Sequence, residues 1–278
     1  MKGWNFAFTR RWLGYLALVI AFAIACTLLS LWQLARRDEA RAEIELVETN
    51  WESAPVPVAD VLPELDSFDR DDKWVPVTLS GHYRLDEQLL VRGRPRDGSP
   101  GFEVLVPFQL DTGEVFIVDR GWLPVGREQD TPDVVPEAPA GDVTVVVRLK
   151  PGEPIVAGRS APEGQIATIH LPDIAERIGE PTFTGAYGLL VSEDPSVATV
   201  PAPVIKPAAD EGPHLSYAFQ WLVFGVMAFI GLGWAIRQEF RIRNQDDPAE
   251  QERAAERARK AAAKPRSDAE IEDALLDR

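Results

Sequence analysis

The architecture is decided by two stretches, LGYLALVIAFAIACTLLSLWQLA at Leu13–Ala35 and LSYAFQWLVFGVMAFIGLGWAI at Leu215–Ile236. Neither stretch contains Asp, Glu, Lys, Arg or Pro. A helix rises about 1.5 Å per residue, so a helix of either length crosses the roughly 30 Å hydrocarbon core of a bilayer. We therefore predict two transmembrane helices, at residues 13–35 and 214–236.

Each stretch has an alternative interpretation. The first could be a cleaved signal peptide, but it is longer than the usual apolar region of about 7–15 residues and ends on Trp32-Gln33-Leu34 rather than on an A-x-A-like site. The second could be a core helix of a soluble domain. Its three glycines and the tryptophan near each end are more typical of a membrane span.

The cations that flank the two stretches predict the orientation. They are Lys2, Arg10 and Arg11 before the first stretch, and Arg237, Arg241 and Arg243 after the second. Positive flanks stay in the cytoplasm, so we expect a multi-pass protein of the bacterial plasma membrane with residues 1–12 and 237–278 inside and 36–213 outside. Arg36, Arg37 and Arg41 oppose this orientation, although a long domain is translocated largely regardless of its charge.

The charge is concentrated between the two stretches. The chain carries −15 overall, and residues 36–213 hold 16 Lys and Arg against 33 Asp and Glu, a balance of −17. So acidic a domain is a poor binder of nucleic acid. The single cysteine, Cys26, lies in the first apolar stretch, which excludes a disulfide scaffold for the domain.

The sequence pattern in the middle of the chain is typical of a β domain. After a helical continuation at 36–54 and an irregular linker at 55–72, alternating apolar residues predict strands at 74–83, 88–96, 102–110, 114–124, 142–150 and 186–192. Asp111-Thr112-Gly113 predicts a hairpin, and residues 172–179 predict a short helix that begins near Pro172 and ends at Gly179. The expected fold is a mostly antiparallel β domain with one short helix, flanked by two transmembrane helices.

Two further segments were assigned on composition. Residues 194–213 hold several prolines and predict an extended return to the membrane. The charged tail from residue 237 predicts a solvated helix around residues 251–264, with too few large apolar residues to build a core.

Motifs for catalysis are absent from the sequence. There is no phosphate-binding P-loop, no G-x-S-x-G, no H-E-x-x-H and no cluster of Cys and His at metal-ligand spacing, so we do not expect an enzyme. Two of the three histidines, His82 and His170, lie in a predicted strand and before the short helix. Each is interpreted as a surface or packed side chain.

His214 differs because it begins the second apolar stretch. Helical spacing places it on one face with Tyr217, Ala218 and Trp221. Polar groups at membrane depth usually face a partner, a cavity or a ligand, and His is a common axial ligand of heme iron. The alternative is a hydrated histidine in an interfacial aromatic belt, and the spacing alone does not decide between the two.

A second candidate is cationic. Arg92, Arg94 and Arg96 would share one face of a strand, and Arg120 could join them from the following hairpin. Such a cluster could bind a carboxylate ligand such as the propionates of heme. The alternative is a solvated or internally ion-paired face.

Several segments carry a resemblance when they are taken in order. They are Trp32-Gln33 with Arg36, Gly81-His82-Tyr83, Arg92-Gly93-Arg94 with Gly101-Phe102-Glu103-Val104, Asp119-Arg120-Gly121-Trp122-Leu123-Pro124, and His214-Leu215-Ser216-Tyr217-Ala218-Phe219-Gln220-Trp221. They are similar to W-Q-x-x-R, G-x-[YF], R-x-R…G-[YF]-x-V, N-R-G-W-[VI]-P and H-x-x-Y-A-x-Q-W of the Surfeit-locus (Surf-one) family of cytochrome c oxidase assembly proteins, actinobacterial type. Asp119 departs from the usual Asn. The likeness spans about residues 10–240, and residues 130–185 add little to it.

The resemblance implies a non-enzymatic role in assembling heme–copper cytochrome c oxidase. It implies that heme a is bound with His214 as the axial ligand of iron, and that Tyr217 and Trp221 line the same site. The partners it implies are the catalytic subunit of the oxidase, with heme a synthase as a further candidate. The alternative function is a membrane-anchored scaffold that stabilises the oxidase subunit without binding heme.

Overall fold

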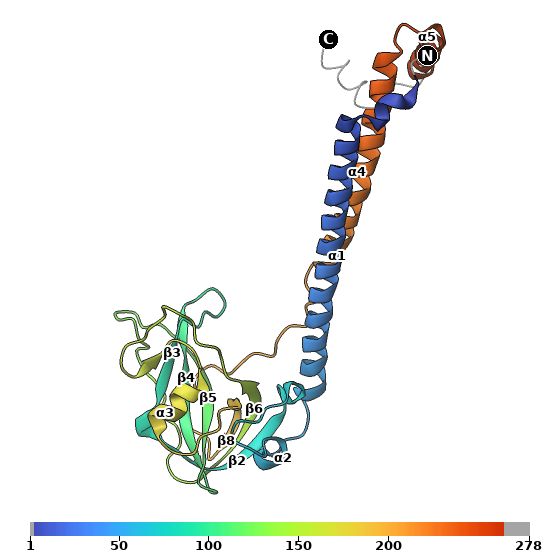
Figure 1. Cartoon of the computed structure of the whole chain (residues 1–278). Coiled ribbons are helices and arrows are strands. Elements are labelled where there is room, and N and C mark those ends of the chain that lie inside the picture. The colour runs from blue at the N-terminus through green and yellow to red at the C-terminus, as the bar shows by residue number, and fades with distance from the viewer. Residues whose placement is uncertain (1–2, 264–278) are drawn as a thin grey trace. The chain divides into compact units, whose positions relative to one another are not determined.

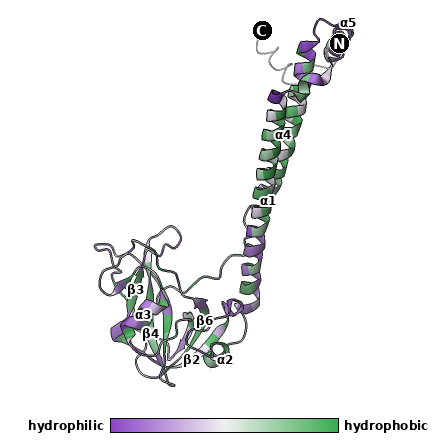
Figure 2. Cartoon of the chain, viewed as in Figure 1, coloured by the Kyte–Doolittle hydropathy of each residue, from purple (hydrophilic) through white to green (hydrophobic). Residues whose placement is uncertain are grey.

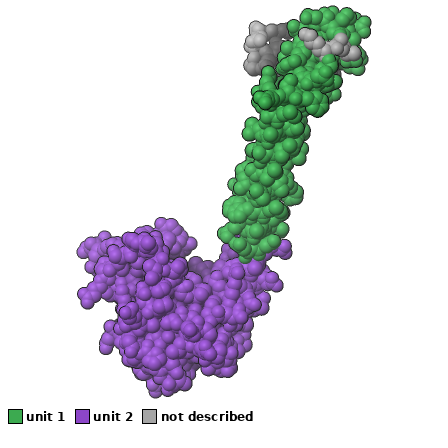
Figure 3. All heavy atoms as spheres, in the orientation of Figure 1, with its two compact units in different colours: residues 1–39, 212–278 green, residues 40–211 purple. Residues whose placement is uncertain are grey.

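The computed structural model describes residues 3–263, which form two compact units (Figures 1 and 3). The helical unit comprises the described parts of residues 1–39 and 212–278, and the β unit comprises residues 40–211. One long helix, α1 (Arg10–Asn50), contributes residues to both units.

The helical unit contains the two helices that correspond to the apolar stretches. α1 pairs with α4 (His214–Arg243), and the short η1 (Trp4–Phe8) and the charged α5 (Pro248–Ala262) complete the unit. Both long helices extend beyond the predicted spans. Beyond residue 35, α1 continues because Ala, Glu, Arg and Leu, all strong helix formers, dominate its sequence.

A seam of small and apolar side chains joins α1 to α4. On α4 the buried or half-buried positions recur every three or four residues, at His214, Ala218, Trp221, Gly225, Ala228, Leu232 and Ala235. A Cβ built on Gly225 would lie 3.7 Å from the Cβ of Cys26, an ordinary van der Waals distance, so the two helices are in contact at this position. Small residues at a helix contact are typical of membrane helix pairs.

The rest of both helices is apolar and uncovered. In the most apolar 18-residue stretch of each, only 11% of α1 and 6% of α4 is buried within the molecule. Figure 2 shows in green the hydrophobic residues along the paired part of the helices. A core helix of a soluble protein would be mostly covered, so both are candidate membrane spans.

The β unit is a mixed sheet that closes on itself. Its strands are β1 (Val56–Pro57), β2 (Pro76–Tyr83), β3 (Leu89–Arg92), β4 (Gly101–Leu110), β5 (Val115–Pro124), β6 (Val143–Pro151), β7 (Gln165–Ile166) and β8 (Ala186–Asp194). Their order is β1-β2-β6-β8-β5-β4-β3-β7, and an additional pairing of β2 with β4 makes a five-stranded barrel. The β1–β2, β3–β7 and β5–β8 pairs are parallel and the others are antiparallel.

Two apolar clusters lie on opposite faces of these strands. The first includes Val77, Phe108 and Phe116 and also covers the short α2 (Val58–Val61). The second joins the other face of β4 and β5 to α3 (Leu171–Ile178) and to Val47 and Trp51 near the end of α1. The last turns of α1 are therefore part of the core of the β unit.

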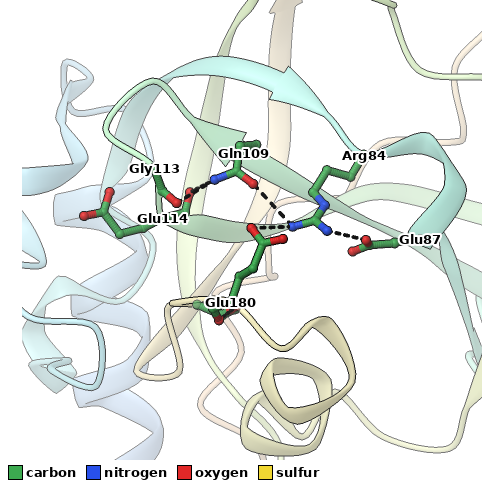
Figure 4. Close-up of polar contacts among 7 residues, drawn as sticks. Arg84, Glu87, Gln109, Gly113, Glu114 and Glu180 are labelled. Atoms are coloured by element: carbon green, nitrogen blue, oxygen red, sulfur yellow. Dashed lines mark hydrogen bonds and ion pairs between the residues drawn. The ribbon is translucent and has the colours of Figure 1, made fainter.

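Arg84 lies beside the β2–β4 pairing that closes the barrel and contacts several residues there (Figure 4). It follows β2, its backbone N–H donates to Pro107 O on β4 at 2.8 Å, and its guanidinium contacts Gln109 at 3.3 Å and Glu180 at 3.0 Å. It also pairs with Glu87 in η3 (Leu85–Glu87). These contacts tie β2, β4 and the loop after α3 together.

Most of the predicted elements are confirmed. The chain has two candidate membrane helices that flank a β-rich domain, the β4–β5 hairpin turns at residues 111–113, and α3 ends at Gly179, which adopts a left-handed φ of 75°. A helix over Pro248–Ala262 matches the one predicted in the tail.

Two predictions were wrong. The strand predicted at 88–96 ends at Arg92, because Gly93 takes φ of 72° and breaks the extended conformation. The region 55–72 is not a simple linker: it holds β1, α2 and η2 (Arg70–Asp72), and its Val58 and Leu62 are buried in the barrel core. The proline and aspartate residues of this region are typical of loops, so its short strand and helices were not predicted.

Candidate functional site

His214 is held by a side chain from the other long helix. Its Nδ1 lies 2.8 Å from Oε1 of Gln33 in the seam between α1 and α4. Gln33 belongs to the Trp32-Gln33 segment of the family resemblance, and its contact with His214 was not predicted. The two residues are far apart in sequence, so only the pairing of the helices brings them together.

This contact determines which nitrogen of His214 is available. The amide oxygen of Gln33 can only accept, so this contact fits a ring that donates from Nδ1, and in the neutral imidazole with that tautomer the lone pair is on Nε2. Within residues 3–263 no hydrogen bond to Nε2 is found. A Cβ on Gly212 would lie 3.4 Å from Nε2, so the glycine leaves that nitrogen accessible. Histidines that bind metals commonly donate their other ring N–H in this way.

The two aromatic residues predicted beside His214 take different positions. Trp221 is half-buried and continues the seam after the buried Ala218, with an edge contact to Phe224 at 5.9 Å. Tyr217 is 46% exposed. The structure therefore places Trp221 in line with His214, while Tyr217 points out of the seam.

The arginines of the predicted cationic cluster are already paired with acids. Arg94 lies between Glu103, at 3.0 Å, and Glu153, and Arg92 is 3.2 Å from Asp130. Arg96 donates to Pro203 O at 3.0 Å. Because β3 ends at Arg92, these side chains do not share a strand face as predicted.

Arg120 does not join them, which corrects the prediction. Its side chain is fully buried, pairs with Glu193 of β8 at 2.8 Å and donates to Pro136 O at 3.0 Å. Its guanidinium carbon lies 5.5 Å from the ring centre of Tyr83, whose hydroxyl donates to the same glutamate. Burial, the charge of Glu193 and this hydrogen bond raise the pKa of Tyr83, so the phenol stays protonated. Arg120 is a structural residue of the barrel.

A second buried polar group surrounds Asp119. It contains Arg94, Glu103, Lys150, Glu153 and Tyr187. Burial and the neighbouring Glu103 raise the pKa of Asp119 well above its usual range, which favours a neutral carboxyl. Burial opposes ionisation of Glu153 as well, but hydrogen bonds from Arg94 and Ile169 N–H hold its pKa below the usual value. Oδ1 of Asp119 accepts from Gly121 N–H at 2.9 Å.

Asp119→Asn is expected to stabilise the β unit at neutral and higher pH. Between the unfolded pKa of about 3.9 and the raised folded pKa, the folded state binds more protons, so stability falls as pH rises. Asn keeps the acceptor for Gly121 and cannot ionise, so it removes this loss of stability. Urea unfolding of the full chain in detergent at pH 4.5 and pH 8 measures it. An equal difference between variant and wild type at both pH values would contradict the assignment.

The remaining residues of the Asp119–Pro124 segment are also structural. Gly121 takes φ of 127°, and a Cβ there would lie 2.5 Å from Ala202 O, so the position requires glycine. Trp122 Nε1 donates to Arg94 O at 2.7 Å, and its ring occupies the space that a Cβ on Gly101 would fill. The segment thus anchors β5 to β4 and to the return segment at residue 202.

Comparison with known proteins gives these features a context. A model of the SURF1 family matches residues 20–226, which include Gln33, the Asp119–Pro124 segment and His214. The chain belongs to the SURF1 family. The match contains most of α1, all of the β unit and the first half of α4.

Individual relatives agree with the SURF1 assignment. Uncharacterized SURF1-like proteins of Mycobacterium tuberculosis and Mycobacterium bovis are 35% identical over 240 residues, covering 84% of this chain and 87% of theirs. The cytochrome oxidase assembly protein SHY1 of Saccharomyces cerevisiae is 31% identical over 121 residues, 42% of this chain and 30% of its own length.

Proposed function

We propose that this SURF1-family protein is a membrane-anchored assembly factor for heme–copper cytochrome c oxidase, and that it binds heme a while the catalytic subunit matures. Membership of the family and the likeness to a yeast oxidase assembly protein support the role in assembly. The observation that carries the heme proposal is the His214–Gln33 pair, which leaves Nε2 of His214 available for iron.

The residues of the seam fit an axial ligand. In this proposal His214 binds iron through Nε2, Gln33 fixes the ring through Nδ1, and Trp221 with the apolar helix surfaces covers the porphyrin and its tail. Bound heme would supply an iron centre for delivery to the oxidase subunit. Arg92, Arg94 and Arg120 fit propionates poorly, because nearby carboxylates already neutralise them.

Deletion of the gene tests the assembly role. We expect membranes of the deletion strain to contain less heme a in cytochrome oxidase and to show lower oxidase activity, while the transcript of the catalytic subunit is unchanged. The wild-type chain should restore both. Normal oxidase with normal heme a content in the deletion strain would reject the proposal. Copurification of the chain with the catalytic subunit, or with heme a synthase, would identify the partner.

The proposed topology places both chain termini in the cytoplasm and the β unit outside the plasma membrane. A reporter active only in the cytoplasm is expected to work when fused to either terminus and to fail when inserted beside Gly98, an exposed turn between β3 and β4. Activity at Gly98, or its loss at the C-terminal fusion, would contradict this topology.

A scaffold that binds no heme is the second candidate. The internal pairing of the arginines favours it, because propionates would have to displace Glu103, Glu153 or Glu193. Absorbance separates the two candidates. Protein purified from cells that make heme a should show a Soret band if it carries heme, and none if it is only a scaffold.

A further inference from the structure

A groove lies between α1 and α4, near the start of α1 and the end of α4. It has a volume of about 460 Å³, within the range of roughly 300–1,000 Å³ found for small-molecule sites. Its walls are apolar, with Leu18 and Val19 from α1 and Leu232, Ala235 and Ile242 from α4. His214 lies at the opposite end of α4, so the groove is distinct from the proposed heme site, although Leu232 and Ala235 of the seam also line it.

The mouth of the groove carries hydrogen-bond donors and positive charge. Arg11 and Gln238 line it, together with Glu239, which pairs with Arg11 at 3.8 Å and with Arg243 at 2.9 Å. Trp12 also lines the groove; it is only 4% exposed, and its indole Nε1 has no hydrogen-bond partner in the described residues. A buried N–H without a partner is a donor that an acceptor in the groove could satisfy.

Aromatic rings lie beside the mouth, and further cations occur nearby in the sequence of the two helices. Trp12 contacts Phe6 at 6.0 Å and Tyr15 at 5.5 Å, and the Arg11 guanidinium lies 5.5 Å from the Trp12 ring centre. Arg10, Arg237 and Arg241 occur on the same turns of the two helices. A belt of aromatic and cationic residues at the end of an apolar helix is typical of the headgroup region of a bilayer.

We propose that this groove binds one anionic phospholipid. An acyl chain lies along Leu18, Val19 and Leu232, and the phosphate accepts hydrogen bonds from Trp12 Nε1 and Arg11. Arg11 and Arg243, which both pair with Glu239, leave one positive charge in excess of that carboxylate, and this excess favours an anionic headgroup over a zwitterionic one. The proposal requires only that the helices span the membrane, and it does not depend on heme.

Two glycines of α4 provide a matched pair of variants. Gly231 lines the groove and Gly233 does not, and a Cβ at either position meets no atom within 4 Å. Gly231→Leu should therefore fill the groove without separating the helices, and Gly233→Leu should add the same side chain elsewhere on the same turn.

Native mass spectrometry of the full chain in detergent, titrated with phosphatidylglycerol or phosphatidylcholine, tests the proposal. We expect one tightly bound phosphatidylglycerol, about tenfold weaker binding in Gly231→Leu, and wild-type binding in Gly233→Leu. Trp12→Phe should reduce the preference for phosphatidylglycerol over phosphatidylcholine. Equal lipid binding by the two glycine variants would overturn the proposed site. Equal affinity of the wild type for both lipids would overturn the selectivity for an anionic headgroup. Conversion of a dimer to a monomer by Gly231→Leu would show that the groove is a protein interface instead.

Discussion

The His214→Ala protein, purified from cells that make heme a, is expected to show a weakened or shifted Soret band. The substitution removes the iron ligand but leaves the apolar helix surfaces, so porphyrin affinity should fall without disappearing. Membrane insertion and protein amount should be normal, because the side chain and its hydrogen bond to Gln33 lie at the end of the seam. The absorbance spectrum per mole of protein is the measurement.

Histidines and Gln33 provide the controls for this experiment. His82 is exposed on β2, and His170 lies 2.9 Å from Asp173 on α3, so alanine at either position should leave the spectrum unchanged. Gln33→Leu keeps the iron ligand but removes the acceptor that orients it, and we expect roughly 10–100-fold weaker heme binding. If His214→Ala has the spectrum of the wild type, His214 is not the ligand. If the wild type carries no heme, the scaffold replaces the heme carrier.

Gly121→Glu is expected to abolish accumulation of the folded protein. The position has φ of 127°, which strains any residue with a side chain, and the added Cβ would lie 2.5 Å from the Ala202 carbonyl oxygen. Backbone strain alone costs about 1–3 kcal/mol, and the clash with Ala202 O adds to it. The total is a large fraction of the stability of a typical domain, about 5–15 kcal/mol. Immunoblots of membranes and thermal unfolding in detergent measure the effect.

Gly113→Glu separates strain from the clash. Gly113 also has a positive φ, of 108°, but it lies in the β4–β5 turn and a Cβ there meets nothing within 4 Å. We expect this variant to accumulate with a modest loss of stability. Normal abundance of Gly121→Glu with lost oxidase assembly would instead make Gly121 a contact with a partner.

The periodic elements of this fold could be predicted from the sequence. These elements have patterns that are local in the sequence. Examples are the long apolar runs, the alternation at 114–124, and Pro172 and Gly179 at the two ends of α3. The short parallel strands β1 and β7 could not be predicted, because two-residue elements exist only through their partners β2 and β3.

The candidate site shows the same division. His214 was identifiable as a polar residue at a helix start, whereas the Gln33 contact needed the register between α1 and α4. Arg120 was misassigned because its partner Glu193 lies 73 residues away and no local pattern indicates the pair. In so acidic a domain, the arginines were interpreted as a binding site for an external carboxylate. In the folded β unit, carboxylates of the same domain pair with these arginines.

Folding of the closed barrel affects the pairing of α1 with α4. Arg41 and Glu211, near the two ends of the β unit, form an ion pair at 3.5 Å, so folding of that unit brings the ends of a long loop together. Closing a flexible loop of that length would otherwise cost roughly 4.5 kcal/mol of chain entropy. Once the barrel has formed, α1 and α4 pair as though they were joined by a short connection. Substitutions deep in the barrel should therefore loosen the contact between Gln33 and His214 without touching either residue.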